Sequence, residues 1–286
     1  ATAVSEGIGA ALGMQVEEAA RGIAEIVDET MASAARVHAV ENGKDTAGRT
    51  LIAFGGAAPL HAVRLAQKLG ISRVVIPPDA GVGSAHGFLD APIAYEVVRT
   101  LLVRLDALDQ ATIGRLFADM RAEAEAVVRL GVPQGQLTET RTAFMRYRGQ
   151  GHEIAVVLPV GVVDSIVLRA AFDAAYEQMF GRTIPRLEVE AVTWTLTLTQ
   201  PHELPQRAAP PPAIGPAPAS DQCRIVESMT GEAMQATVFA RDRLAAGMAM
   251  TGPAMIQEDG TTTIVPPGFT AHVGAAGEIV IEEDKT

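Results

Sequence analysis

Residues 51–62 read Leu-Ile-Ala-Phe-Gly-Gly-Ala-Ala-Pro-Leu-His-Ala, and residues 73–76 read Arg-Val-Val-Ile. The apolar run before the glycine pair is typical of a strand buried in a parallel sheet, and the proline suits the first turn of a helix. The second apolar run is typical of another buried strand. We therefore predict a βαβ unit with a right-handed crossover, made of strand 50–54, helix 59–69 and strand 73–76.

Hydrophobic periodicity predicts further elements on both sides of this unit. Apolar residues at spacings of three and four indicate an amphipathic helix over residues 17–38. Later in the chain the same criteria predict helices over 113–130 and 167–180, strands over 142–147, 153–158 and 187–199, and short strands over 235–239, 254–257, 261–265, 270–273 and 278–281.

These elements predict an α/β lobe over residues 1–100, an α+β domain over 101–200 and a small β domain over 221–286. Seven of the 17 prolines fall between residues 201 and 218, a density that excludes helices and central strands. We expect residues 201–220 to form an extended linker, which proteases would cut near residues 216–222 to release the C-terminal β domain.

Composition and charge limit the class of protein. The 286 residues are enough for two or three units with a sizeable core. Lys and Arg number 23 and Asp and Glu number 34, so the net charge is 23 − 34 = −11, which argues against unspecific binding to nucleic acid or an anionic membrane. No apolar stretch is long enough to cross a bilayer, and the sequence starts at Ala1 without a signal-peptide pattern. The single cysteine, Cys223, allows no intramolecular disulfide, and we expect a cytoplasmic protein.

The glycine pair Gly55-Gly56 has two interpretations. A buried strand that delivers glycines to a helix N-terminus lets backbone N–H groups approach an anion without a Cβ in the way, which is the geometry of a nucleotide site. Alternatively, the glycines only let a tight βα turn pack closely, and spacing alone favours this interpretation. The stretch contains neither a GxxxxGK[ST] P-loop nor a GxGxxG fingerprint.

Four motifs follow one another along the chain. They are Phe-Gly-Gly-Ala-Ala-Pro-Leu-His-Ala at 54–62, Ile-Pro-Pro-Asp-Ala-Gly-Val-Gly-Ser-Ala-His-Gly at 76–87, Met-Arg-Tyr-Arg-Gly-Gln-Gly-His-Glu at 145–153, and Gly-Pro-Ala-Met-Ile at 252–256 with Thr-Thr-Thr-Ile-Val-Pro-Pro-Gly at 261–268. Together they resemble the hydantoinase A, 5-oxoprolinase and acetone carboxylase β-subunit family. The resemblance covers essentially the whole chain and corresponds to the C-terminal part of a longer subunit.

The resemblance implies an actin/Hsp70-like ATPase core that binds ATP with Mg²⁺ between two lobes. Gly55, Gly56 and Ala57 would border the nucleotide through their backbone N–H groups. Ala58 departs from the family pattern, which usually has a glycine-type residue before the proline. The family's Asp-Gly-Gly-Thr-type phosphate hairpin has no counterpart in this sequence. One lobe cannot complete phosphoryl transfer alone, because the phosphates must be clamped from both sides.

Three further side chains are candidates for ligand contact, each with a structural alternative. His61 lies in the first turn of the predicted helix, where its imidazole either hydrogen-bonds the nucleotide or packs against the next strand. Ser84 and His86 lie on a predicted glycine-flanked loop after strand 73–76, at the carboxyl end where open α/β sheets bind ligands. The alternative for both is a polar loop that satisfies its own backbone.

Two polar clusters also have alternative interpretations. The cluster from Arg146 to Glu153 either binds an anionic group through Arg146 or Arg148, or forms an interdomain hydrogen-bond knot, the commoner role of strand-edge arginines. Glu258 and Asp259 indicate a turn before a threonine-rich strand, since adjacent strand residues point to opposite faces. The six histidines show no zinc-type spacing, and we assign no metal ligand or catalytic residue.

By resemblance, the leading function is that of an ATP-dependent hydantoinase or oxoprolinase-type subunit, which phosphorylates a cyclic amide for ring-opening hydrolysis. The alternatives are a subunit of an ATP-dependent ketone carboxylase and a non-catalytic assembly lobe that docks a partner chain. Expected partners are an N-terminal portion or separate chain with the phosphate-binding lobe, a second hydantoinase B-type subunit, and a small cyclic amide or ketone. A lobe without its partner should leave apolar surface uncovered around helix 17–38 and loop 81–89.

Overall fold

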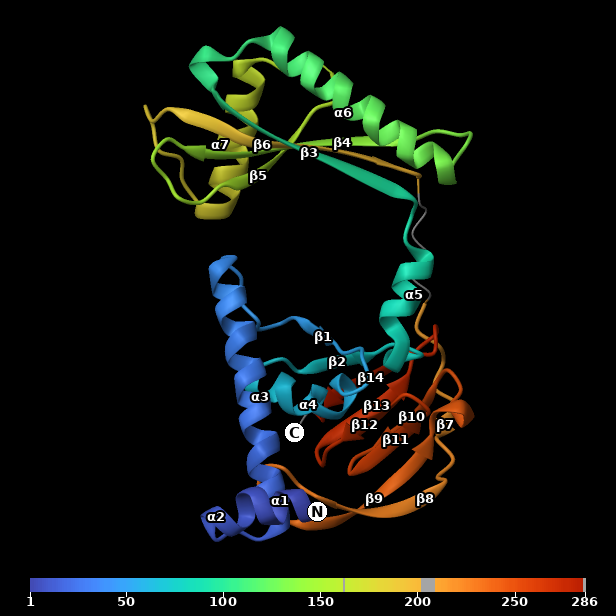
Figure 1. Cartoon of the computed structure of the whole chain (residues 1–286). Coiled ribbons are helices and arrows are strands. Elements are labelled where there is room, and N and C mark those ends of the chain that lie inside the picture. The colour runs from blue at the N-terminus through green and yellow to red at the C-terminus, as the bar shows by residue number, and fades with distance from the viewer. Residues whose placement is uncertain (162, 202–208, 285–286) are drawn as a thin grey trace. The chain divides into compact units, whose positions relative to one another are not determined.

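The computed structural model describes residues 1–161, 163–201 and 209–284 and divides the chain into two compact units (Figure 1). Unit 1 combines Ala1–Asp90 with Gln206–Thr286, and unit 2 is Ala91–Pro205. The boundary expected at residue 100 therefore lies inside unit 2, and the C-terminal segment shares a unit with the N-terminal one.

The βαβ arrangement at the start of unit 1 is confirmed. β1 (Thr50–Ile52) pairs in parallel with β2 (Arg73–Ile76), and α4 (Ala58–Leu69) connects them. Pro59 stands in the first turn of α4, where its missing N–H costs no hydrogen bond. Gly70 ends the helix in a left-handed conformation with φ 68°, which glycine adopts without strain.

Strands from the C-terminal part of the chain extend the sheet beyond β2. β14 (Ile279–Glu283) runs antiparallel to β2, and beyond it lie β13 (Phe269–Val273), β10 (Met248–Thr251) and β7 (Gly215–Pro216). The resulting six-stranded sheet has the order β1-β2-β14-β13-β10-β7.

This pairing corrects the expected separate β domain over residues 221–286. Ile279 and Ile281 of β14 are fully buried and share one hydrophobic core with Ile76 of β2 and Ala66 of α4. Separating β14 from β2 would expose these side chains to water, so the C-terminal strands do not form an independent domain. Residues 1–90 and the C-terminal segment fold as one unit.

A second sheet of unit 1 has the strand order β12-β11-β9-β8. Its strands are β8 (Asp221–Val226), β9 (Ala233–Ala240), β11 (Ala254–Glu258) and β12 (Thr261–Val265). β12 packs against α4, so this helix contacts strands of both sheets. The predicted strands over 235–239, 254–257 and 261–265 are thereby confirmed.

The predicted amphipathic helix is α3 (Val16–Glu41), which packs on α4 through ion pairs. Glu25 accepts hydrogen bonds from Arg64 Nη2 at 2.7 Å and from Lys68 Nζ at 2.6 Å. The bond from Arg64, helped by Lys68, lowers the pKa of Glu25 to about 2, although burial opposes the shift. Three short helical segments precede α3, namely α1 (Thr2–Val4), η1 (Ser5–Gly9) and α2 (Ala10–Leu12).

The expected linker over residues 201–220 is described from residue 209 onward, and its residues 202–208 lie outside the described part. Ile214 N–H donates to Gly247 O at 3.0 Å, and Ala217 N–H donates to Ala249 O at 2.8 Å. The described stretch is therefore bonded along β10 instead of standing apart as a linker. After a cut near residues 216–222, the C-terminal fragment would not be released as expected. It would stay bound to the rest of unit 1, because β14 pairs with β2.

Unit 2 is a four-stranded antiparallel sheet with two helices on one face. The strand order is β3-β6-β4-β5. Its elements are β3 (Ala94–Arg104), α6 (Gln110–Gly131), β4 (Thr138–Tyr147), β5 (Ile154–Leu158), α7 (Ser165–Phe180) and β6 (Val189–Thr199), and η3 (Leu105–Ala107) follows β3. Edge-to-face aromatic pairs join the helices to the sheet, Phe117 with Trp194 and Phe172 with Tyr147. The α+β class predicted for this region is confirmed.

The polar cluster at residues 146–153 is tied within unit 2. Arg146 Nε donates to Glu190 Oε1 at 2.8 Å, and Gln150 Nε2 donates to the Tyr176 hydroxyl at 3.1 Å. The cluster is therefore a hydrogen-bond knot, but the partners seen in the described residues belong to one unit. The expectation of an interdomain knot is corrected, because β4 pairs with β6 and brings Arg146 opposite Glu190.

Elements that the sequence pattern did not predict are short or weakly buried. β3 has a single buried side chain, Val97, so its sequence shows no clear alternation of apolar and polar residues. β7, with two residues, and β10, with four, are too short to give a periodic signal. Of the helices in the described ranges, none combines the length and apolarity needed to span a bilayer.

We expect Ile281→Ala to destabilise unit 1 alone. Ile281 is fully buried in β14, so its truncation should cost about 2–5 kcal/mol. Trp194, the single tryptophan, is fully buried in unit 2, and its fluorescence reports on that unit, whereas far-UV circular dichroism reports on both. In urea, part of the circular dichroism transition should move to lower denaturant while the tryptophan transition stays in place. An equal shift of both signals would show that the two units unfold together.

Candidate functional site

The carboxyl ends of β1 and β2 meet in a cluster of loops. The glycine loop, residues 54–57, follows β1, and residues 77–82 follow β2. Gly55 has φ 109°, a conformation that favours glycine, and its N–H donates to Ala80 O at 2.6 Å. The two loops are thus bonded directly, at the edge where open parallel sheets bind ligands.

The turn between β11 and β12 closes over both loops. Thr261 Oγ1 donates to Gly56 O at 2.7 Å. A Cβ on Gly81 would stand only 2.9 Å from the carbonyl oxygen of Gly260, so any side chain at Gly81 would force the two backbones apart. A Cβ on Gly56 would be 3.6 Å from the same oxygen, which is an ordinary contact.

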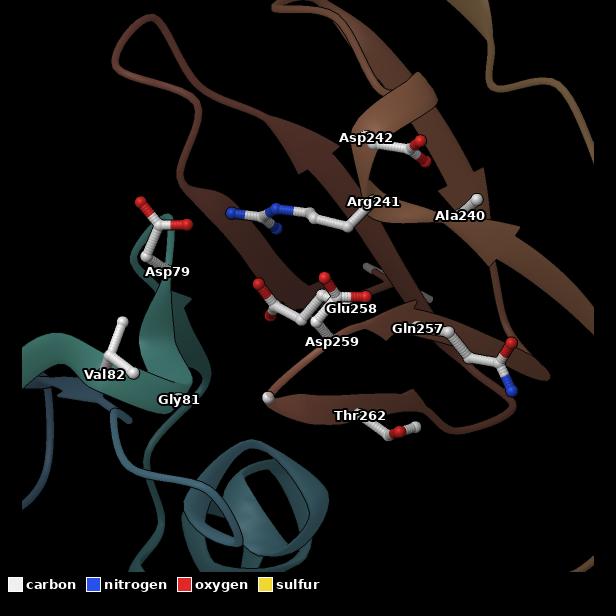
Figure 2. Close-up of a pocket in the computed structure, with 11 residues that line it drawn as sticks. Asp79, Gly81, Val82, Ala240, Arg241, Asp242, Gln257, Glu258, Asp259 and Thr262 are labelled. Carbon is white, nitrogen blue, oxygen red and sulfur yellow. The ribbon is translucent and has the colours of Figure 1, made fainter.

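A pocket of about 860 Å³ opens beside this cluster (Figure 2). Its walls come from the loop after β2, from η4 (Arg241–Arg243) and from the β11–β12 hairpin. Figure 2 shows the Arg241 side chain reaching toward Asp79, with the carboxylates of Glu258 and Asp259 nearby. The lining residues are Asp79, Gly81, Val82, Ala240, Arg241, Asp242, Gln257, Glu258, Asp259, Gly260 and Thr262.

This acidic pocket holds four carboxylates around one cation, Arg241. Burial raises the pKa of Glu258; Arg241 opposes this shift and Asp79 adds to it. Burial also lowers the pKa of Arg241, against the attraction of Glu258 and Asp79. Arg241 Nη2 donates to Gly277 O at 2.7 Å, while Nη1 is buried without a hydrogen-bond partner in the described part of the chain.

The chemistry of the acidic pocket suits a ligand with several hydrogen-bond donors. Its carboxylates accept hydrogen bonds from sugar hydroxyl or amino groups but repel free phosphate oxygens. The buried Nη1 of Arg241 offers one donor to an acceptor on the ligand. Next to the pocket, α4 begins after Ala57 without a side-chain cap. Pro59 has no N–H, and Leu60 N–H donates to Ala57 O at 3.1 Å. Of the first three helical residues, Ala58 alone can therefore offer its N–H to an anionic group.

His61 lies outside the acidic pocket. Its Nδ1 is 2.8 Å from Oδ1 of Asp28 on α3, and the Asp28 side chain is only 4% exposed. The imidazole lines a second pocket of about 280 Å³, whose walls come from α3, α4, the end of β8 and the segment after β12. The polar partner of His61 is therefore Asp28 on α3, whereas the structural alternative expected packing against the next strand.

Ser84 and His86 lie on a helix, α5 (Gly83–Asp90), where the sequence predicted a loop. Helices tolerate glycine at a cost of about 1 kcal/mol per residue, so Gly83 and Gly87 do not prevent helix formation. Ser84 is exposed, as are most residues of α5. His86 Nε2 is 3.3 Å from Asp79 Oδ2 at the rim of the acidic pocket.

The sequence singles out the glycine loop as a candidate, but it does not indicate the residues that the fold places beside this loop. Arg241 follows a predicted strand and carries no motif, although a charged residue directly after an apolar run is a weak signal of a strand-end site. Glu258 and Asp259 do lie at the end of β11 and in its turn, as predicted. Nothing local, however, shows that this turn lies over Gly56, about 200 residues earlier.

Two family models match the chain. Hydantoinase/oxoprolinase matches residues 1–97, and the hydantoinase/oxoprolinase C-terminal domain matches residues 107–276, which is more than half of the chain. The expected resemblance is therefore confirmed at both ends.

Individual relatives agree with the family models. Caprolactamase subunit alpha from Pseudomonas jessenii is 30% identical over 277 residues, which are 93% of this chain and 40% of that protein. A fungal 5-oxoprolinase and an acetone carboxylase beta subunit are more distant relatives. The chain thus spans about two-fifths of the length of its caprolactamase relative.

Two solved structures share the fold. The crystal structure of ATP-dependent caprolactamase from Pseudomonas jessenii aligns with a TM-score of 0.76 and 27% identity, over 99% of this chain and 42% of its own. The nucleotide-free structure of acetone carboxylase aligns with a TM-score of 0.71 over the same shares, and its 23% identity supports the fold alone.

We expect Gly81→Ala to destabilise unit 1 and Gly56→Ala to leave it nearly unchanged. The new methyl group at Gly81 would meet the Gly260 backbone, which must move, at a cost of about 1–3 kcal/mol. At Gly56 the methyl group makes only an ordinary contact, and the change should stay within about 0.5 kcal/mol. Urea unfolding followed by circular dichroism measures both. If the two variants lost the same free energy of unfolding, the β11–β12 turn would not be in close contact with the loop after β2.

We expect Glu258→Gln to stabilise the protein at neutral pH. Because folding raises the pKa of Glu258 above its ordinary value of 4.5, ionisation of this carboxyl opposes folding as the pH rises above 4.5. The melting temperature of the variant should exceed that of the wild type at pH 7, with the difference vanishing below pH 4.5.

Glu25→Gln is the control of opposite sign. The pKa of Glu25 is lowered to about 2, so its ionised form stabilises the fold above pH 4.5 and this contribution is lost toward pH 2. The control should therefore melt below the wild type at pH 7 and approach it in acid. A Glu258→Gln variant that also melts lower at pH 7 would contradict the assignment for Glu258.

Proposed function

This chain belongs to the hydantoinase/oxoprolinase family, and from that premise we propose that it forms the adenosine-binding side of an ATP-dependent subunit that activates a cyclic amide. The observation that supports this most is the glycine loop under the β11–β12 turn, with the acidic pocket beside it. A relative described as an ATP-dependent caprolactamase shares the fold over 99% of the chain.

The proposed reaction follows the chemistry of a poor leaving group. An amide oxygen does not leave as such, so ATP phosphorylates the oxygen of a hydantoin- or lactam-type ring and ADP is released. One water adds to the activated carbon, the C–N bond breaks as the nitrogen takes up a proton, and the ring opens to an acyl phosphate. A second water then hydrolyses the acyl phosphate to a carboxylate and free phosphate. This chain would bind and orient the nucleotide. The groups that contact the transferred phosphoryl would lie in the part of the subunit outside this chain, because catalysis of phosphoryl transfer requires donors on both sides of the phosphates.

Within unit 1, we propose that residues 1–90 correspond to the second lobe of an actin/Hsp70-like core. The order strand, glycine turn and helix at β1 and α4 supports this proposal. Gly55 N–H is already bonded to Ala80 O, so contact with the nucleotide would come from the N–H groups of Gly56 and Ala57, which have no protein acceptor in the described residues. Ribose hydroxyls and the adenine amino group would face the carboxylates of the acidic pocket.

We assign no nucleotide contact to His61 or Ser84. His61 bonds Asp28 and faces the second pocket, and Ser84 lies exposed on α5. Both were candidates on sequence grounds, but the loop cluster does not include them. Direct contact is proposed for the glycine loop and for the acidic pocket, in which Arg241 is the single cationic side chain among the lining residues.

Mg²⁺ would enter with the phosphates of ATP. Within the described ranges, no three His, Cys, Asp or Glu side chains are grouped so that they could hold a metal ion. The carboxylates of the acidic pocket therefore do not amount to a metal cage. Octahedral Mg²⁺ commonly takes its ligands from phosphates, water and one or two carboxylates. We propose that the carboxylate ligands come from the part of the subunit outside this chain.

The proposed partners follow from the length comparison. The caprolactamase relative is a subunit, and this chain matches 40% of it. We propose that an N-terminal section carries the phosphate-binding lobe and that a second, hydantoinase B-type subunit completes the enzyme. The chain itself would then be one half of a nucleotide site.

Calorimetric titration of the chain with ATP and with ADP tests this proposal. We expect weak and similar binding of both nucleotides and no hydrolysis by the pure chain, because the contacts to the terminal phosphate lie outside it. Gly56→Val should lower the affinity for ADP by at least about tenfold. Its melting temperature without ligand should fall only slightly, since a Cβ fits at this position.

Gly114→Val is the matched control, because this glycine lies on α6 of unit 2 with no neighbour within 4 Å of a new Cβ. It should bind ADP like the wild type. A chain indifferent to both nucleotides would instead favour a non-catalytic assembly lobe, and hydrolysis by the pure chain would overturn the idea of a divided site.

A further inference from the structure

We propose that the outer face of α3 and the free edge of β1 dock the section of the subunit that lies outside this chain. We call these features the outer stripe (Ile23, Ile26, Val27, Ala34 and Val37) and the β1 edge (Thr50–Ile52). Both belong to unit 1 (Figure 1). The inference rests on the proposed function for the identity of the partner and adds the surface through which that partner binds.

The outer stripe is apolar and exposed. Its members recur at spacings of three, four and seven along α3, so they lie on one side of the helix. Ile26 is 69% exposed and Val37 is 57% exposed. The residues that α3 buries are small or polar, namely Ala19, Asp28 and Ala32. A helix ordinarily buries its large apolar side, so α3 presents to solvent the side that another apolar layer would cover.

Ion pairs hold α3 in this orientation. Glu25 bonds Arg64 and Lys68 of α4, and Lys68 Nζ also donates to Glu29 at 2.8 Å. Turning α3 to bury the outer stripe would break these pairs and would carry the buried Asp28 into water away from His61. The exposure of the stripe is therefore built into the α3–α4 contact.

The β1 edge belongs to a strand whose sequence is typical of one covered on both faces. Residues 51–54 form an uninterrupted apolar run, yet Ile52 and Phe54 are exposed in this structure. In the described residues β1 pairs only with β2, and Ile52 is 63% exposed. Its outer N–H and C=O groups are open to another strand.

The occupant is the remaining section of a subunit of the relatives' length. The caprolactamase structure matches 99% of this chain but only 42% of its own, so more than half of such a subunit lies elsewhere. An α/β layer supplies both things that the surface lacks, a strand for the β1 edge and an apolar face for the outer stripe. Apolar surfaces of this kind belong to permanent contacts more than to transient ones.

Hydrogen–deuterium exchange tests the proposal on two proteins, this chain and a full subunit that contains it. Peptides covering residues 20–38 and 50–54 should exchange at least about tenfold more slowly in the full subunit, because docking suppresses local opening and pairs the β1 amides. Peptides of unit 2 serve as the internal reference. Equal exchange of both segments in the two proteins would overturn the proposal.

The double variant Ile26→Glu/Val37→Glu tests the outer stripe separately. Both side chains are exposed in this chain, so its own melting temperature should stay within the experimental error. In the full subunit the same charges would be buried, and the protection of residues 20–38 should be lost. Ile166→Glu, at a 77% exposed position of α7, is the matched control and should leave the protection intact. Persistent protection in the double variant would overturn the assignment of the stripe.

Sedimentation of this chain alone distinguishes a second copy as occupant. We expect the chain not to dimerise through the outer stripe. A dimer that dissociates on Ile26→Glu would overturn the proposal. None of these measurements uses nucleotide or turnover. A failure of docking is thus seen independently of a failure of ATP binding.

Discussion

The antiparallel pairing of β14 with β2 is the contact on which unit 1 and its pocket depend. It joins residues 73–76 to the C-terminal strand, with all of unit 2 inserted in the sequence between them. Closing such a long loop costs conformational entropy, which the shared core around Ile76 and Ile281 offsets. The same C-terminal segment carries the β11–β12 turn, so the pairing that completes the sheet also brings Thr261 to Gly56.

Electrostatics divide the proposed nucleotide-binding surface into two parts. The acidic pocket has carboxylates around a single guanidinium, whose buried Nη1 is available to a ligand acceptor. The glycine loop and the start of α4 nearby offer the backbone N–H groups of Gly56, Ala57 and Ala58, without a side-chain charge. A nucleotide placed across the two would meet acceptors at its sugar and donors toward its phosphates. Neither surface alone provides the cationic clamp that phosphoryl transfer needs, which is why a second section of the subunit is part of the proposed function.

The sequence predicted local structure well and distant contacts poorly. β2 begins and ends as predicted, and α4 and α7 agree within two residues, because proline, glycine and apolar periodicity act over a few residues. The pairing of β14 with β2 left no local signal, so the C-terminal strands were assigned to a domain of their own. Asp28 was equally hidden, since a carboxylate on an amphipathic helix is expected to face water, and only the fold shows that its partner is His61.

The insertion of unit 2 also sets the order in which the protein can be completed during synthesis. β2 leaves the ribosome about 200 residues before β14, and at typical translation rates this interval is roughly 10–40 seconds. Throughout it β2 can pair with β1 while its other edge stays open, and unit 2 acquires all its strands and helices before β14 is made. Unit 1 is therefore completed after unit 2, and in the interval residues 1–90 are the part of this chain that most needs protection by chaperones.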